Sequence, residues 1–297
     1  MKSLPFKLPV RQGSTEIPLW TGTGFKIGDA LFPVLEYSVN FAGWSDDLTT
    51  LHEESAGDAH PIDQASRSDA IRQLQLCLKG NPAPVILEIG CSSGFLLKEI
   101  SLALPHAVLV GADVVNEPLY RLAEKLPNVP LMRFDLLKCP LPDATFDAVV
   151  LLNVLEHIED DTEALRRITC LLKPGGFVII EVPAGPHLYD AYDKALMHFR
   201  RYAMSDLVAK IEKSGLVVSC KSHLGFLVYP AFAYVKRRNQ KSHHNDADSV
   251  VAKQAKDTAS SFLMRTAMRL ESLLARFVSF PTGIRCLITA RKPNNAS

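Results

Sequence analysis

Three carboxylates follow one another in short apolar segments that have the length of β-strands. Glu88 lies in VILEIG, Asp113 ends AVLVGAD and Asp135 ends VPLMRFD. If these segments pair as parallel strands, the acids meet at the carboxyl edge of the sheet, where open α/β sheets bind their ligands. Together they suit one elongated ligand that carries an amino group, a pair of hydroxyls and an aromatic amine.

The first carboxylate precedes a turn that contains two glycines. Gly90 and Gly94 enclose Cys91, Ser92 and Ser93, a G-x-x-x-G spacing that differs from the G-x-G-x-x-G of a pyrophosphate site. Glycine at such a junction lets the backbone turn sharply and approach a ligand closely. An acid two residues before the first glycine suits a cationic amino group better than a diphosphate.

The second and third carboxylates suit the other two parts of that ligand. Asp113, followed by Val114, is placed to accept hydrogen bonds from both hydroxyls of a ribose. Asp135 can accept from an adenine amine while Leu136 and Leu137 cover the ring. Capping of a helix or a turn is the alternative role for both aspartates, and a strand-end surface acid is the alternative for Glu88.

Strand-like and helix-like segments alternate through the middle of the chain. The strands are apolar without alternation, which predicts a parallel sheet covered by helices on both faces. The expected fold is α/β, a Rossmann-like, doubly wound and mostly parallel seven-stranded sheet with a C-terminal antiparallel strand. The expected strands span 85–90, 107–113, 129–135, 146–154, 177–183, 216–226 and 283–292, and the expected helices span 66–80, 94–104, 116–126, 160–172 and 204–215.

Four regions follow from this pattern. Residues 1–65 are expected to form an N-terminal arm with short helices, and residues 66–226 the core, whose first helix is capped by Ser66 or Ser68. Residues 227–280 read as a helical insertion or lid. Its segment 236–249 is polar and expected to be mobile, and 252–280 is expected to be helical. Residues 281–297 hold the last strand and a tail.

Residues 84–183 resemble the core of the class I S-adenosylmethionine-dependent methyltransferases. The similarity lies in LEIGCSSG, GAD, FDLLKCPLPDATFD, NVLEHIEDD and LLKPGGFVIIEVP. It implies S-adenosylmethionine as cofactor, Gly90 and Gly94 in the loop beside the methionine part, Asp113 at the ribose and Asp135 at the adenine. It also places Asn153 under the cofactor. HLYDAYDKALMHFRRY resembles a stretch of bacterial members that modify small molecules or saccharides.

His157 and His198 are the candidate catalytic residues, as general bases toward a hydroxyl or amine acceptor. His157 follows the fourth strand and His198 follows the fifth, so both belong to the face where the reactive end of the cofactor is expected. Arg201 is a candidate to hold an anionic acceptor. The alternatives are a histidine that fixes its own loop, a helix cap and surface ion pairs.

Four aromatic residues complete the candidate acceptor site. Tyr189 and Tyr192 precede His198, whereas Tyr37 and Trp44 belong to the N-terminal arm. An aromatic arm that folds over the site excludes water and selects the acceptor. Packing of the arm onto the core is the alternative.

Composition narrows the classes of function. The 297 residues are 47% hydrophobic and 22% charged with a net charge of +1, so no general attraction to nucleic acid is expected. Six scattered cysteines show no metal-ligand spacing and fit reduced thiols in the cytoplasm. No metal, signal peptide or transmembrane segment is expected.

The expected function is methyl transfer to an oxygen or nitrogen atom of a small molecule. One alternative is a lipid-like or saccharide acceptor at a membrane surface, where the apolar run 224–235 and the helix 252–280 would make peripheral contact. The others are a nucleotide-dependent oxidoreductase and a non-catalytic cofactor-binding subunit.

Overall fold

One large sheet organises the chain. The computed structural model describes residues 4–38, 58, 60–241 and 262–294. Within them, eight strands run in the order β10-β11-β9-β8-β5-β6-β7-β4, and β11 is antiparallel to both of its neighbours while the pairs from β9 to β4 are parallel. The strands are β4 (Val34–Glu36), β5 (Val85–Ile89), β6 (Val108–Asp113), β7 (Leu131–Arg133), β8 (Phe146–Leu152), β9 (Leu172–Pro183), β10 (Val217–Leu224) and β11 (Arg285–Arg291). The expected Rossmann-like fold is confirmed, with one strand more than predicted.

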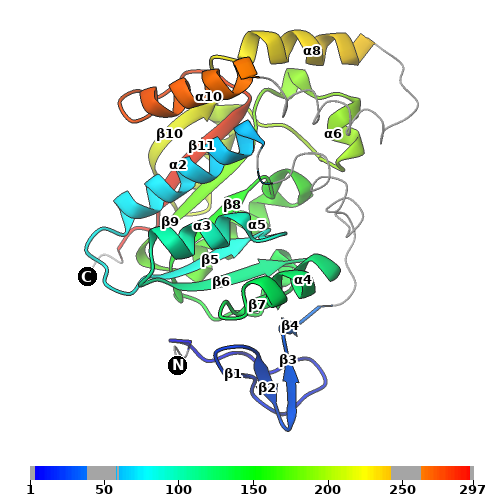
Figure 1. Cartoon of the computed structure of the whole chain (residues 1–297), viewed down its shortest axis with the longest axis vertical. Coiled ribbons are helices and arrows are strands. Elements are labelled where there is room, and N and C mark those ends of the chain that lie inside the picture. The colour runs from blue at the N-terminus through cyan, green and yellow to red at the C-terminus, as the bar shows by residue number, and fades with distance from the viewer. Residues whose placement is uncertain (1–3, 39–57, 59, 242–261, 295–297) are drawn as a thin grey trace.

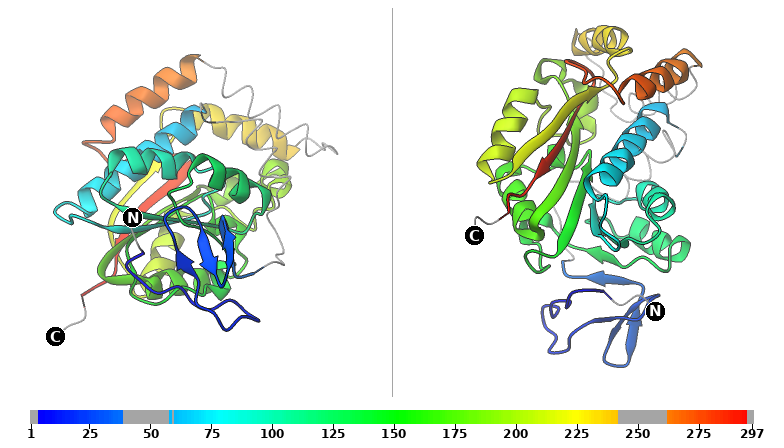
Figure 2. Two further views of the ribbon diagram at one scale, coloured as in Figure 1. Left: turned by 60° about the horizontal axis from the view of Figure 1, so that its bottom comes forward. Right: turned by 90° about the vertical axis from the view of Figure 1, so that its left-hand side faces the viewer.

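Helices cover both faces of this sheet (Figure 2). They are α2 (Pro61–Cys77), α3 (Phe95–Ala103) and α4 (Glu117–Lys125) on one face, and α5 (Asp161–Leu171) and α7 (Met204–Lys213) on the other. Along β5, Val85, Leu87 and Ile89 enter the core under α5 and α7, whereas Ile86 enters the core under α2 and α3. Burial on both sides explains why the strands are apolar without alternation.

Strand β5 is the point where the chain reverses its direction across the sheet. It pairs with β6 on one side and with β8 on the other. Ligands of doubly wound sheets bind at such a switch point, beyond the carboxyl ends of the strands. The loops that follow β5, β6 and β8 therefore form the expected site.

The part of the N-terminal arm that the structure describes, residues 4–38, forms strands, whereas the sequence suggested short helices in the arm. Strands β1 (Leu19–Trp20), β2 (Phe25–Ile27) and β3 (Ala30–Phe32) make a small antiparallel sheet at one end of the molecule (Figure 1). Strand β4 then adds to the edge of the large sheet beside β7. These strands have two or three residues, too few to show the period of a strand in sequence.

The first core helix begins earlier than predicted. Pro61 is its first residue, a position that suits proline because the N–H it lacks would have no partner there. Ser66 is therefore inside the helix, and its hydroxyl oxygen lies 2.8 Å from Glu181 Oε1. The helix ends at Cys77, before Gly80.

Two helices, α8 (Tyr229–Lys241) and α10 (Phe262–Leu274), lie at the opposite end from the small sheet (Figure 1). The start of segment 236–249 is thus helical, and Lys236 is buried and paired with Asp190 and Asp193. Residues 242–261 lie outside the described residues. Among the helices that are described, none has both the length and the apolarity required to cross a bilayer.

Candidate functional site

The turn after β5 is fixed against β6 by its backbone. The N–H groups of Gly90 and Cys91 donate to the carbonyl oxygen of Ala112 at 2.8 and 3.1 Å. Gly90 has φ +78° and Gly94 has φ +74°, a region that side chains disfavour. A Cβ atom at Gly90 would also overlap the Val154 side chain. The loop after β8 therefore lies directly beside the glycine turn.

Asp113 joins this turn to the end of β6. Its Oδ2 accepts the N–H of Ser92 at 2.7 Å, and its Oδ1 accepts those of Val114 at 2.7 Å and Val115 at 3.3 Å. The carboxylate thus caps its own loop. Two carboxylate oxygens offer about four acceptor positions, so Asp113 can also accept from ribose hydroxyls.

Glu88 is a buried carboxylate in the last part of β5. Glu88 is only 5% exposed. Its Oε2 has no hydrogen-bond partner among the described residues. Burial, with the negative charge of Asp113 adding to it, raises the pKa of Glu88 well above 4.5. A buried carboxylate with no cation is costly, so this position favours a positively charged ligand group.

Asp135 lies at the same edge of the sheet as Asp113. Asp113 is in register with Arg133, so Asp135 follows the end of β7. Its Oδ1 accepts the N–H of Leu137 at 2.9 Å and caps the short helix η1 (Leu136–Lys138). Leu136 is 4% exposed and belongs to the core, which leaves Leu137 as the better candidate to cover a ring.

Asn153 directly follows β8 and has a left-handed backbone, at φ +54°. Its Nδ2 donates to Glu181 Oε1 at 3.2 Å, and the same oxygen accepts from Arg285 Nη1 at 2.7 Å. The buried Glu181 and its arginine were not predicted as site residues. The signal for Glu181 was available, because it is the one acid in the apolar strand FVIIEVP.

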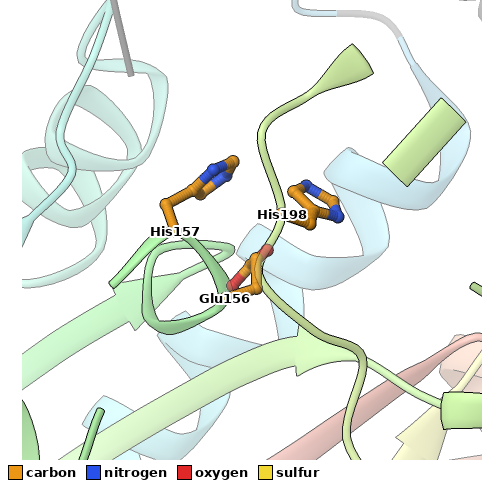
Figure 3. Close-up of side chains that lie close together, drawn as sticks. All are labelled: Glu156, His157 and His198. Atoms are coloured by element: carbon orange, nitrogen blue, oxygen red, sulfur yellow. The ribbon is translucent and has the colours of Figure 1, made fainter. Parts of the chain in front are cut away.

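His157 and His198, the two candidate catalytic histidines, lie close together, and Glu156 lies beside them (Figure 3). His157 ends the short helix η2 (Leu155–His157), and its ring centroid lies 4.7 Å from that of His198. Glu156 is fully buried, and burial raises its pKa to about 8. One ligand atom from each of the three lies within 4.8 Å of the other two. These three residues could hold a metal ion. The sequence did not indicate the group, because His198 lies far from Glu156 and His157 along the chain.

His198 is held by a buried charged network. Its Nδ1 lies 3.1 Å from Asp193 Oδ1, which also accepts from Arg201 Nη1 at 2.9 Å. The other oxygen, Asp193 Oδ2, accepts from Lys236 Nζ at 2.8 Å. Burial lowers the pKa of His198, so the imidazole is neutral at physiological pH. Neither Asp193 nor Lys236 was singled out by sequence.

The candidate acceptor residues have different surroundings. Arg201 uses its guanidinium on Asp193 and on the carbonyl oxygens of Ala184 and Ile284, so the structure does not favour the expected role in holding an anionic acceptor. Tyr189 donates to the carbonyl oxygen of His198 at 2.6 Å. Tyr192 contacts Lys236, whose Nζ lies 4.9 Å from the ring centroid.

The arm residues do not reach this group of side chains in the described structure. Tyr37 follows β4, at the far edge of the sheet, and its hydroxyl donates to the carbonyl oxygen of Pro9 at 2.9 Å. This contact corresponds to the packing alternative. Trp44 lies outside the described residues.

Known proteins share the central part of the chain. A family model described as a methyltransferase domain matches residues 87–180. An uncharacterised methyltransferase of Mycobacterium bovis is 34% identical over 106 residues, which cover 35% of this chain and 52% of that protein. The chain thus spans about half the length of this curated relative.

Solved structures share the fold over more of the chain. Phosphoethanolamine N-methyltransferase 2 of Haemonchus contortus, solved with S-adenosyl-L-methionine, has a TM-score of 0.55 at 17% identity and covers 83% of this chain and 57% of its own. The [4+2]-cyclase SpnF has a TM-score of 0.51 at 18% identity, with 77% and 82% covered. Because these two differ in their named reactions, the shared fold alone does not select the chemistry.

Proposed function

Because residues 87–180 form a domain of the class I S-adenosylmethionine-dependent methyltransferase family, we propose that this chain transfers a methyl group to an oxygen or nitrogen atom of a small-molecule acceptor. The observation that carries the proposal is the buried carboxylate of Glu88, whose Oε2 has no hydrogen-bond partner among the described residues, beside the glycine turn and Asp113. S-adenosylmethionine supplies an activated methyl group and also carries a cationic amino group.

The residues at the switch point fit this cofactor. Glu88 would bind the amino group, and the turn from Gly90 to Gly94, which contains Cys91, would lie along the methionine part. The carboxylate of Asp113, with Val114 beside it, would bind the ribose hydroxyls. The adenine would lie at Asp135, Leu136 and Leu137, and Asn153 would line the floor of the pocket through its contact with Glu181.

Histidines on the loops after β8 and β9 are placed to handle the acceptor. Positioning of the acceptor can supply about 7–11 kcal/mol of the barrier, and a general base typically adds a factor of about 10²–10⁴. His198 is neutral and held by Asp193, as a base requires. His157 lies beside it. We assign the acceptor side to this pair, with Tyr189 and Tyr192 nearby.

Calorimetry separates this function from the oxidoreductase alternative. We expect the purified chain to bind S-adenosylmethionine and not NAD, because no pyrophosphate-type glycine spacing follows β5 and Glu88 would repel a diphosphate. Binding of NAD with no affinity for S-adenosylmethionine would reverse the assignment.

Catalysis itself is tested by transfer of an isotope-labelled methyl group. We expect label from S-adenosylmethionine to enter a low-molecular-weight fraction of cell extract. Label that never leaves the cofactor, in a protein that binds it tightly, would favour the non-catalytic subunit instead. All six cysteines are free, in keeping with the reducing cytoplasm that we propose as the location.

A membrane-surface acceptor is the second candidate, because α10 exposes an apolar face. On α10, Phe262 is 83% exposed, Leu270 and Leu273 are also exposed, and exposed arginines stand at 265 and 269. The exposed Arg276 and Phe277, the latter 87% exposed, follow the end of this helix. Apolar and basic side chains on one amphipathic helix are typical of contact with anionic lipid. On this reading, the acceptor is a lipid-like molecule or a saccharide attached to one.

Co-sedimentation with vesicles tests the second candidate. We expect phosphatidylglycerol vesicles to pellet the wild type and to pellet less of a double variant, Phe262→Ser with Phe277→Ser. The matched control is Leu102→Ser, an exposed leucine on α3. If all three proteins pelleted equally, or if none of them pelleted, the membrane-surface acceptor would be ruled out and a soluble acceptor would remain.

A further inference from the structure

A cluster of three possible metal ligands lies beside the proposed cofactor pocket. Glu156 and His157 come from the loop after β8, and His198 comes from the segment after the short helix α6 (Ala191–Ala195). One ligand atom from each lies within 4.8 Å of the others. Figure 3 shows the three side chains gathered at this point, with Glu156 below the two rings. Val154, in the same loop, packs over Gly90.

The carboxylate of Glu156 has no protein cation bound to it. It is fully buried, and neither of its oxygens has a hydrogen-bond partner among the described residues. The nearest buried arginines are engaged elsewhere, Arg285 with Glu181 and Asp63, and Arg201 with Asp193. An isolated buried carboxylate costs several kcal/mol, so the position calls for a bound cation or a proton.

His198 is oriented as a metal ligand would be. Its Nδ1 contacts the carboxylate of Asp193 at 3.1 Å, and a carboxylate paired with Arg201 and Lys236 can only accept. The proton is therefore assigned to Nδ1, and Nε2 keeps a lone pair. A carboxylate that fixes the far side of a ligating histidine is a recurrent feature of metal sites.

We propose that Glu156, His157 and His198 bind one divalent first-row transition ion, such as Zn²⁺ or Co²⁺. Two imidazoles and one carboxylate are the donor set of catalytic sites that keep positions open for water or substrate. Bond lengths of about 2.0–2.2 Å place neighbouring ligand atoms about 3.0–3.5 Å apart. The present separations of up to 4.8 Å would have to shorten by side-chain rotation when the ion binds.

The site also suggests which acceptor atom is used, a step that rests on the proposed function. An oxygen bound to a divalent cation loses its proton more readily. A hydroxyl acceptor that coordinates the ion would lose its proton to solvent, because the lone pairs of His157 and His198 would be bound to the ion, and its oxygen would then take the methyl group as S-adenosylhomocysteine leaves. The ion would thus replace the general base proposed above, which favours an oxygen acceptor over an amine. The binding of the ion itself does not depend on methyl transfer.

Titration with Co²⁺ tests the site without any methyl acceptor. Protein freed of metal by a chelator is expected to bind one Co²⁺ per chain and to show visible absorption bands of low-coordinate Co²⁺. Glu156→Gln and His198→Ala are each expected to weaken binding at least about tenfold. His106→Ala, which changes an exposed histidine on the α3–β6 loop, is expected to bind as the wild type does.

Two results would overturn the site. One is a wild type that shows no visible bands and no stoichiometric binding, which would leave Glu156 as a buried protonated acid. The other is Glu156→Gln binding Co²⁺ as tightly as the wild type, since this near-isosteric change keeps the fold. Thermal unfolding of each variant separates loss of a ligand from loss of the fold. S-adenosylmethionine affinity measured on the same samples shows whether the proposed function fails independently.

Discussion

The Glu88→Gln variant is expected to bind S-adenosylmethionine roughly 10- to 100-fold more weakly than the wild type, because a hydrogen bond to a charged group is worth about 1.5–3 kcal/mol. The same variant is expected to unfold at a higher temperature. The carboxylate is buried without a partner for Oε2, and a neutral amide of the same shape costs less to bury. Opposite changes in affinity and stability distinguish a ligand-binding acid from a structural one.

The gain in stability depends on pH in a defined direction. Burial, then the charge of Asp113, raises the pKa of Glu88 well above 4.5, so the folded state holds this proton more tightly than the unfolded chain. Stability from this group is present below about pH 4.5 and falls as the pH rises. The difference between Glu88→Gln and the wild type therefore widens from pH 5 to pH 8.

Calorimetry at pH 7 and thermal unfolding at pH 5 and pH 8 make both measurements. Each kcal/mol gained in unfolding free energy raises Tm by about 2–4 °C in a protein somewhat smaller than this one. Glu124→Gln, on the exposed face of α4, is the matched control and should change neither quantity. If Glu88→Gln retained full affinity, the amino group would have to bind elsewhere.

Asp113 is a less direct test of the same pocket. Its carboxylate holds the N–H groups of Ser92, Val114 and Val115, so its removal frees the glycine turn as well as a ribose contact. A lost affinity would then have two causes. Oε2 of Glu88 holds no N–H group of this loop. Substitution of Glu88 is therefore expected to remove a ligand contact without freeing the loop, unlike substitution of Asp113.

The parts of the fold that sequence could predict are those with a strong period. β5, β6 and β8 are continuous apolar runs, and each was placed within two residues of its observed bounds. The β1–β3 sheet was missed because its strands are too short for a pattern. The start of α8 was missed because Lys236 reads as solvated, and only tertiary structure supplies the two aspartates that bury it.

The residues of the candidate site likewise divide into those that the sequence could predict and those that it could not. Glu88, Asp113 and Asp135 were predictable because each follows a recognisable strand, and parallel strands end at one edge. The group of Glu156, His157 and His198 was not predictable as a cluster, because the segments after β8 and β9 meet only in the folded chain. Arg201 was misread since a charged side chain in sequence gives no sign that it points inward, toward Asp193.

The Asp193→Asn variant is expected to lose about 3–5 kcal/mol of unfolding free energy, the cost of leaving buried charges unpaired. Asp193 is 0% exposed at its side chain and contacts Arg201, 4% exposed, and Lys236, 1% exposed. Arg201 and Lys236 would both remain buried, and Asp190 would be the one carboxylate among the described residues that still pairs with Lys236. Urea unfolding at pH 7 measures the loss. The control Asp206→Asn, in the exposed first turn of α7, should stay within about 0.5 kcal/mol.

Adding Lys236→Met and Asp190→Asn to Asp193→Asn is expected to restore part of that loss, because the triple variant removes a buried cation together with both carboxylates that pair with it. The restored fold would still lack the carboxylate that orients His198. If Asp193 also positions this histidine for a cation, the triple variant should bind Co²⁺ about 10- to 100-fold more weakly than the wild type despite its recovered stability. Equal Co²⁺ affinity in a stable triple variant would restrict Asp193 to holding α6 and α8 together. For Asp193→Asn alone, a loss of unfolding free energy below about 1 kcal/mol would mean that water reaches the network of Asp193, Arg201 and Lys236.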